Sequence, residues 1–228
     1  MLSASGTPPR PGLTRCPWAH RLKAMGETLH WENVYLTKAP DAVSWYRPHL
    51  ELSLNLISHV AGEPSASIID IGGGASTLVD DLLERGYQSL TVMDISPAAL
   101  TAAKSRLGPV AEKVQWLTAD VTRASLAEQA YDVWHDRAVF HFLTAQEDRD
   151  RYVSQAIHAV KHGGFVIVST FGPEGPTKCS GLDVSRYDAE SLHQQFGRRF
   201  RLVESTTELH ETPFGTTQQF VYCCCKVE

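Results

Sequence analysis

The sequence predicts a doubly wound α/β fold, in which a mostly parallel sheet carries helices on both faces and ends in one reversed strand. Three observations predict it: short β-branched runs alternate with helical patterns, a run of glycines follows the first strand, and two strand patterns come last without a helix between them. Alternating strands and helices form right-handed βαβ units, and such units make a parallel sheet.

The predicted parallel strands are short and contain many β-branched residues. They are Ser67–Ile71, Ser89–Asp94, Val114–Thr118, Tyr131–His135 and Gly164–Thr170. Helical patterns lie between the first of these strands, at Ser76–Arg85 and Pro97–Leu107. Within Ser76–Arg85 the leucines and a valine recur at helical spacing, which gives one apolar stripe that faces the sheet.

The last two predicted strands, Phe200–Glu208 and Gln218–Lys226, break the alternation. Their connection contains Pro213 and Gly215 and leaves no room for a helix. Consecutive strands with a short connection pair antiparallel, so the parallel sheet gains one reversed strand. Upstream, the pattern of Trp31–His59 predicts one or two helices that pack over the mouth of the sheet.

Length and composition favour one globular domain. The chain has 228 residues, of which 43% are hydrophobic and 21% charged, and these are ordinary values for a globular protein. The formal net charge of −5 gives no electrostatic reason to expect nucleic-acid binding. No apolar run approaches the roughly 20 residues that span a bilayer, so we expect no membrane segment.

The cysteines predict a protein of the reducing cytoplasm. They are Cys16, Cys179 and the run Cys223-Cys224-Cys225, and no two of them form a C-x-x-C pair. A run of three cannot build a spaced disulfide framework, and no group of cysteine and histidine has the ligand spacing of structural zinc. We therefore expect a cytoplasmic location and no metal.

Residues 1–26 differ in composition from the rest and predict a disordered N-terminal extension. They contain several prolines and four basic residues but no acid, and they lack the apolar core of a secretory signal. An organellar transit peptide, or an upstream start with Met25 as the natural first residue, would give the same composition. We therefore place the folded domain at residues 27–228.

Three consecutive glycines after the first strand predict a ligand-binding turn. These glycines, residues 72–74, lie between Ser67–Ile71 and the next helix. Glycine allows a positive φ and lets a ligand touch the backbone. Asp94 ends the next strand, and a carboxylate at that place can accept both hydrogen bonds from a ribose diol. The pattern therefore predicts a nucleoside site.

The charge near this turn favours S-adenosylmethionine over a dinucleotide. A dinucleotide fingerprint has a third glycine at the place where Thr77 stands. Asp70 lies next to the turn, where it would repel a pyrophosphate but would suit a sulfonium and the ammonium of a methionine. An NAD-dependent oxidoreductase is therefore the weaker alternative, and a non-catalytic module that keeps the cofactor fold is another.

From Trp31 onward, the order of the motifs resembles the class I S-adenosylmethionine-dependent methyltransferases. Four segments carry the resemblance: DIGGGAS, VMDIS, WLTADV and YDVWHDR. The resemblance implies a seven-stranded, Rossmann-like sheet whose last strand is antiparallel, and S-adenosyl-L-methionine as the cofactor. This agrees with the mostly parallel sheet that the strand patterns predict.

The resemblance also implies cofactor contacts in the loops that follow the strands. Gly72 and Gly74 would face the amino-acid part of the cofactor, and Asp94 would bind the ribose. Asp120 and Val121 would flank the adenine. Aromatic faces suit a sulfonium cation, which adds two tyrosines of the N-terminal segment. The predicted cofactor-binding residues are Tyr35, Tyr46, Asp70, Gly72, Gly74, Asp94, Ile95, Asp120, Val121 and His135.

Methyl transfer from a sulfonium is a direct displacement, so the enzyme mainly holds the acceptor and the methyl group in line. A base is needed only if the acceptor must first lose a proton. The predicted catalytic residues are Asp136, which would orient the acceptor or the cofactor amine, and His141, which is either a base or a packing residue. The irregular loop Phe171–Gly181 is predicted to line the acceptor pocket, with Cys179 in its wall rather than acting as a nucleophile.

The predicted acceptor is a small molecule. The segments Trp31–Tyr35 and Ser44–Tyr46 resemble a subgroup that contains bacterial small-molecule methyltransferases and eukaryotic lysine methyltransferases of elongation factors. Those lysine enzymes usually carry D-K-G-T after the fourth strand, whereas this chain has Asp136 followed by Arg137-Ala138-Val139. A protein lysine substrate is therefore the alternative. The N-P-P-Y motif of adenine, cytosine and glutamine amide methylation is absent from the sequence.

Overall fold

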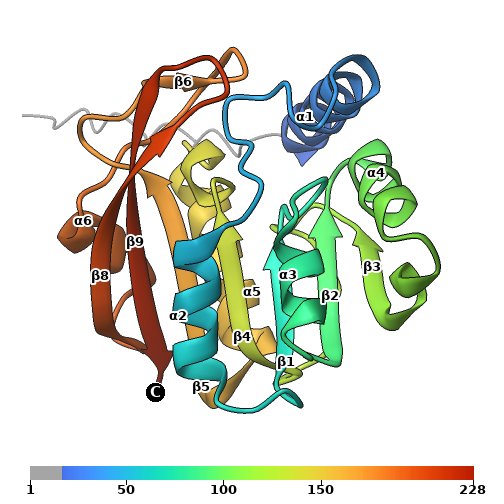
Figure 1. The fold of residues 1–228 in the computed structure, drawn as a ribbon. Helices are drawn as coiled ribbons and strands as arrows, with labels where there is room; N and C mark the ends of the chain where they lie inside the picture. The colour runs from blue at the N-terminus through green and yellow to red at the C-terminus, as the bar shows by residue number, and fades with distance from the viewer. Residues whose placement is uncertain (1–16) are drawn as a thin grey trace, which may run out of the picture.

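The computed structural model describes residues 17–228, which form six α-helices and a seven-stranded sheet (Figure 1). The helices are α1 (Pro17–Thr37), α2 (Glu51–Ala61), α3 (Leu78–Glu84), α4 (Pro97–Leu107), α5 (Gln146–Ala159) and α6 (Ala189–Phe196). The strands of the sheet are β1 (Ser67–Ile71), β2 (Ser89–Asp94), β3 (Val114–Thr118), β4 (Tyr131–Arg137), β5 (Val160–Phe171), β8 (Phe200–Glu211) and β9 (Thr217–Val227). A separate hairpin pairs β6 (Lys178–Cys179) with β7 (Leu182–Asp183).

The sheet is parallel except for one strand, and its order is β3-β2-β1-β4-β5-β9-β8. β1 pairs in parallel with β2 and β4, β2 pairs with β3, and β4 pairs with β5. β9 runs antiparallel to both β5 and β8. The predicted doubly wound, seven-stranded sheet with an antiparallel last strand is confirmed. The reversed strand lies one position in from the edge of the sheet.

Most strand positions agree with the prediction, and the strand ends differ where pairing continues past the β-branched run. The bounds of β1, β2 and β3 are as predicted. β4 continues to Arg137, which pairs with Ser169, and β5 begins at Val160, which pairs with Tyr131. Because β4 continues to Arg137, the side chains of His135, Asp136 and Arg137 alternate between the two faces of the sheet.

Helix α1 begins at Pro17, inside the segment for which the sequence predicts disorder. Proline suits the first turn of a helix because its φ is fixed near the helical value and its missing N–H has no partner there. The predicted boundary at residue 26 thus falls within α1, residues 1–16 lie outside the described part, and the disordered extension stays a prediction. Glu32 ties α1 to the start of α4, since its Oε2 accepts hydrogen bonds from Ser96 Oγ (2.6 Å) and Ala98 N (3.0 Å).

The two helices predicted over the mouth of the sheet take different places (Figure 1). α1 lies beside α4 near the carboxyl ends of the strands, as predicted. α2 instead lies along one face of the sheet, where it contacts β4, β5 and α3. Its buried side, which includes Leu54 and Ile57, covers apolar strand residues and explains this position.

An apolar layer on each face of the sheet holds the helices. On one face α2 and α3 pack against the sheet through a cluster that includes Leu54 and Val133. On the other face α5 and α6 pack through a cluster that includes Trp134 and Tyr152, and Trp134 Nε1 donates a hydrogen bond of 2.8 Å to the Tyr152 hydroxyl. Neighbouring residues of β4 thus point into opposite layers, because side chains alternate along a strand.

The cysteine run of β9 is part of these layers. Cys223 and Cys225 pack in one layer and Cys224 in the other, so the prediction that the first two share a face is confirmed. All three are buried, and burial raises the pKa of each thiol well above its usual value. Within residues 17–228, no helix has the length and apolar character of a membrane span.

Candidate active site

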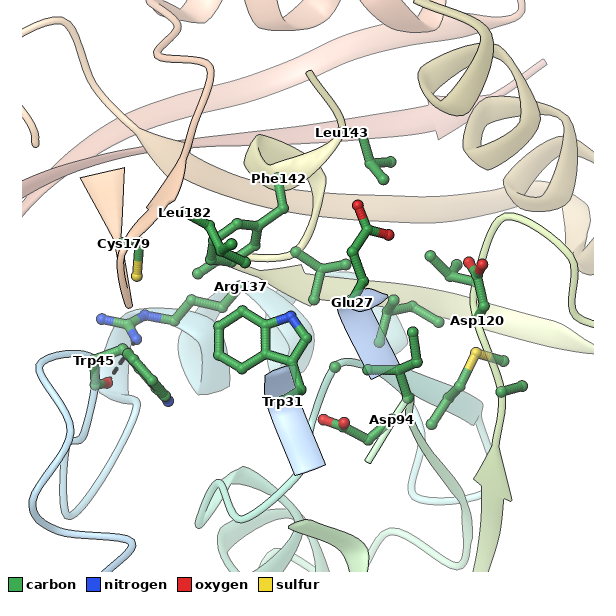
Figure 2. Close-up of a pocket in the computed structure, with 18 of the residues that line it drawn as sticks. Glu27, Trp31, Trp45, Asp94, Asp120, Arg137, Phe142, Leu143, Cys179 and Leu182 are labelled. Atoms are coloured by element: carbon green, nitrogen blue, oxygen red, sulfur yellow. Dashed lines mark hydrogen bonds between the residues drawn. The ribbon is translucent and has the colours of Figure 1, made fainter. Parts of the chain in front are cut away.

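A cavity of about 320 Å³ lies at the carboxyl ends of the first four strands (Figure 2). The strand order reverses between β1 and β4, and ligands of open α/β sheets bind at such a switch point. The end of β2 and the loops after β1, β2 and β3 contribute to its wall the residues Gly72, Asp94, Ile95, Asp120 and Val121. A smaller cavity of about 50 Å³ adjoins it and shares Gly72 and Arg137 with it.

The glycine turn has no room for a side chain at Gly72 or Gly74. Gly72 and Gly74 have φ values of +64° and +43°. A Cβ on Gly72 would lie 2.1 Å from Val139 Cγ2, and a Cβ on Gly74 would lie 2.7 Å from Asp94 Oδ2. Only glycine therefore lets Val139 and Asp94 pack this closely on the turn, and Gly72 lines both cavities whereas Gly74 lines neither.

Asp94 is the buried carboxylate of the larger cavity. The residue is 6% exposed, and its Oδ1 accepts a hydrogen bond of 2.8 Å from Ser96 N. Burial raises the pKa of Asp94 to about 7, and the nearby carboxylate of Asp70 adds to this rise. The carboxylate is thus held in place by the turn after β2, with Oδ2 near the glycine turn, where a sugar diol could reach it.

Asp120 and Val121 lie at the end of the larger cavity formed by the loop after β3. Asp120 Oδ1 accepts hydrogen bonds from Thr122 N (2.9 Å) and Thr122 Oγ1 (2.7 Å), which fixes the turn after the strand. Arg123 Nε lies 3.7 Å from Asp120 Oδ2. This end of the cavity therefore offers a fixed carboxylate beside an apolar side chain, an arrangement that suits a purine ring.

The smaller cavity brings together the predicted residues on the other side of the glycine turn. Asp70, His135, Tyr46 and Tyr35 line it, and Tyr35 also lines the larger cavity. Asp70 Oδ1 lies 2.7 Å from His135 Nδ1, and His135 Nε2 lies 2.9 Å from Ser53 Oγ. This chain of hydrogen bonds holds the Asp70 carboxylate next to the turn, where the sequence predicts an ammonium group.

Asp136 does not line either cavity, in contrast to its predicted catalytic role. It is fully buried, and its carboxylate accepts hydrogen bonds from Val139 N (2.8 Å), Phe140 N (3.1 Å) and the Tyr152 hydroxyl (2.6 Å). The cause is the alternation along β4, which turns His135 and Arg137 toward the cavities and Asp136 toward α5. Burial raises the pKa of Asp136 to about 7.

His141 also lies in the interior rather than on a cavity wall. Its Nδ1 accepts a hydrogen bond of 3.3 Å from Phe171 N, and its ring packs against the rings of Phe142 and Phe171. Burial, together with the Arg137 charge, lowers the pKa of His141 to about 3, so the ring is neutral. The ring of His141 thus packs among aromatic side chains in the interior, and its role as a base stays a prediction.

The wall of the larger cavity also contains residues that are not among the predicted site residues. Trp31 of α1 packs edge-on against Trp45 and Phe142, with ring centroids 5.7 and 5.0 Å apart. Val139 and Phe142 belong to the loop after β4, whose position at a carboxyl end was the available sequence signal. Cys179 lies in the wall as predicted, and burial raises its pKa to about 12, so it is a protonated thiol.

Comparison with known proteins identifies a methyltransferase domain in this chain. Residues 68–164 match a family model described as a methyltransferase domain. A mouse eEF1A lysine and N-terminal methyltransferase is 25% identical over 148 residues, which are 62% of this chain and 21% of that protein. A malonyl-[acyl-carrier protein] O-methyltransferase of Anoxybacillus flavithermus is 34% identical over 111 residues, which are 48% of this chain and 40% of that protein. The chain thus spans about a fifth of the length of the eEF1A methyltransferases that it matches.

Solved structures of methyltransferases share the fold. A methyltransferase from Anabaena variabilis superposes with a TM-score of 0.70 at 14% identity, over 90% of this chain and 95% of that one. The Burkholderia thailandensis 1,6-didemethyltoxoflavin-N1-methyltransferase, solved with S-adenosylhomocysteine, gives 0.64 at 18% identity, over 96% of this chain and 94% of that one. The sheet order, the cleft at its switch point and the matched domain lead to one family. Residues 68–164 of the chain are a methyltransferase domain, on the sheet of the class I S-adenosylmethionine-dependent methyltransferases.

Proposed function

We propose that this protein transfers a methyl group from S-adenosylmethionine to a small-molecule acceptor by direct in-line displacement. One observation carries the proposal: the larger cavity continues from the Asp94 and Asp120 end into an aromatic chamber formed by Trp31, Trp45 and Phe142. α1 contributes Trp31 to this chamber, so the chamber is enclosed from the side of the N-terminal helix. Such an enclosed chamber favours a small acceptor over a protein surface.

The roles of the chain's own residues follow from their places. The cofactor supplies an activated methyl group, and the protein has to hold the two reactants at near-attack distance. Asp94 accepts hydrogen bonds from the ribose, while Asp120 and Val121 hold the adenine. The backbone at Gly72 and Gly74 would hold the amino-acid part, with Asp70 in the wall of the smaller cavity facing its ammonium. The aromatic chamber holds the acceptor and keeps water from the reacting atoms.

A protein lysine acceptor is the second candidate, because the mouse relative is named an eEF1A lysine and N-terminal methyltransferase. Labelled S-adenosylmethionine added to the protein with whole lysate separates the two candidates. We expect label in the small-molecule fraction and release of S-adenosylhomocysteine. Label confined to protein bands would favour the second candidate, and failure of the protein to bind S-adenosylhomocysteine at all would refute both.

We also propose a cytoplasmic location. The cysteine run of β9 supports it, because these side chains serve as packing residues in both layers of the core.

Cofactor affinity should rise with pH. The pKa of Asp94 is raised to about 7, and only the ionised carboxylate can accept hydrogen bonds from both ribose hydroxyls. Between about pH 6 and pH 8 the ionised fraction grows roughly tenfold, so calorimetry should show the affinity for S-adenosylhomocysteine increasing by up to about tenfold. The Asp94→Asn variant has no such titration and serves as the control. An equal rise in that variant would assign the pH dependence to another group.

A further inference from the structure

Arg137 is a buried cation in the wall of the larger cavity. Its side chain is 6% exposed, and it ends β4, which directs it away from the α5 layer that holds Asp136. A buried guanidinium is costly unless its charge and its N–H groups find partners. The partners of Arg137 therefore show what it can still bind.

Only some of the nitrogen atoms of this guanidinium have hydrogen-bond partners in the described part of the chain. Nε donates a hydrogen bond of 3.0 Å to the Tyr222 hydroxyl, and Nη1 donates one of 3.0 Å to Trp45 O. Nη2 is buried, and it makes no hydrogen bond to any residue in the described part of the chain. The carboxylate of Glu208 comes to 3.6 Å from Nη2, beyond hydrogen-bond distance. One donor of this cationic group thus has no hydrogen-bond partner in the described part of the chain.

The charge of Arg137 is met by a carboxylate that it shares with a second arginine and by the face of the Phe220 ring, whose centroid lies 4.4 Å from Cζ. Glu208 is shared, because Arg47 forms a hydrogen-bonded ion pair with its Oε1, and the Tyr222 hydroxyl donates to its Oε2. Two guanidinium groups therefore face one carboxylate. Asp183, also in the cavity wall, has its own partner in Lys178, with Oδ1 2.6 Å from Nζ. This part of the wall keeps a positive charge in excess.

The position of Arg137 separates it from the end of the cavity assigned to the nucleoside. In Figure 2 its guanidinium lies beside Trp45 and Cys179, on the opposite side of the view from Asp120, with the Trp31 indole between them. The aromatic chamber of the proposed acceptor site is therefore bounded by a cation at its far end. An aromatic wall with one cation suits a flat molecule that carries one anionic group.

We propose that the methyl acceptor is a small carboxylic acid whose carboxylate is bound by Arg137 and whose apolar body lies against Trp31 and Phe142. This inference rests on the proposed function, because it assigns the acceptor of the same site. A guanidinium matches a carboxylate in planar geometry, and the free Nη2 supplies at least one charge-assisted hydrogen bond. The methionine carboxylate of the cofactor has the same chemistry and is the other source of such an anion.

Benzoate and its neutral isostere benzamide test the inference, titrated by calorimetry or ligand-observed NMR with and without S-adenosylhomocysteine. We expect wild-type protein to bind benzoate at least about tenfold more tightly than benzamide, as a charge-assisted hydrogen bond predicts. Arg137→Gln should abolish this preference. Arg201→Gln, which makes the same charge change at a half-exposed ion pair with Glu228, should keep it. Equal binding of the two probes to wild type, or a preference that survives in Arg137→Gln, would overturn the inference.

Two further measurements keep the test decisive. If Arg137→Gln does not fold, Arg137→Lys replaces it, and we expect a several-fold loss for benzoate with benzamide unchanged, because an ammonium on a flexible stem does not present a donor in the place and plane of Nη2. The second measurement tests whether the carboxylate bound by Arg137 comes from the cofactor. It compares the affinity for S-adenosylhomocysteine with the affinity for methylthioadenosine, which lacks the carboxylate. If the Arg137 variant loses affinity only for S-adenosylhomocysteine, the anion belongs to the cofactor and the inference fails. Absence of S-adenosylhomocysteine binding would instead refute the proposed function, and the benzoate preference of the free protein is measured independently of it.

Discussion

Replacing Asp94 with alanine should weaken S-adenosylhomocysteine binding about 100-fold, because two hydrogen bonds to a charged carboxylate are lost together. Asp94 lies in the wall of the larger cavity, where Ser96 N holds its Oδ1 and its Oδ2 lies beside the glycine turn. Isothermal titration calorimetry of the folded variant measures the loss.

The controls for this variant separate ribose binding from general damage. Asp94→Asn keeps the shape and an acceptor oxygen, so we expect a smaller loss. Asp150→Ala removes an exposed carboxylate from α5 and should leave the affinity unchanged. If Asp94→Ala bound S-adenosylhomocysteine within about twofold of wild type, the nucleoside site would have to lie elsewhere.

Replacing Asp136 with alanine should lower the free energy of unfolding by about 4 kcal/mol, because three buried donors lose their acceptor at once. These donors are Val139 N, Phe140 N and the Tyr152 hydroxyl. Urea unfolding followed by circular dichroism measures the change. The expected result follows from a structural role for Asp136, which holds the loop after β4 against α5.

Two comparisons check this role. Tyr152→Phe removes one of the three donors along with its hydrogen bond from Trp134, so about 1–2 kcal/mol should be lost. Methyl transfer per folded molecule should depend on Asp136 only through the position of the loop. An Asp136→Ala protein of wild-type stability that had lost turnover would contradict this role and restore the catalytic assignment.

The fold could be predicted because its signals are local. The β-branched runs of the first three strands and the three glycines act through neighbouring residues, and a hairpin follows from the short link that contains Pro213 and Gly215. Asp94 could be placed on the same basis, since a residue that ends a parallel strand lies at the carboxyl edge of the sheet.

The sequence could not show which way Asp136 faces, because this depends on the direction of a side chain rather than on its position along the chain. Asp136 and Arg137 are adjacent in the sequence, and the side of the sheet that each faces depends on how far β4 continues and what packs on either face. The sequence alone shows neither where β4 ends nor what packs on each face of the sheet. Phe142 and Trp31 meet across more than a hundred residues of chain, and that contact required the path of α1 over the sheet.

The place of β9 has a consequence for biosynthesis. β5 and β8 both precede β9 in the chain, yet β9 lies between them and pairs with each. As the chain leaves the ribosome, β5 and β8 emerge with unpaired edges, and they cannot join until the later strand arrives. An unpaired edge is a template for association with other chains. The nascent protein is therefore most exposed to aggregation in the interval before β9 has emerged and paired with both strands.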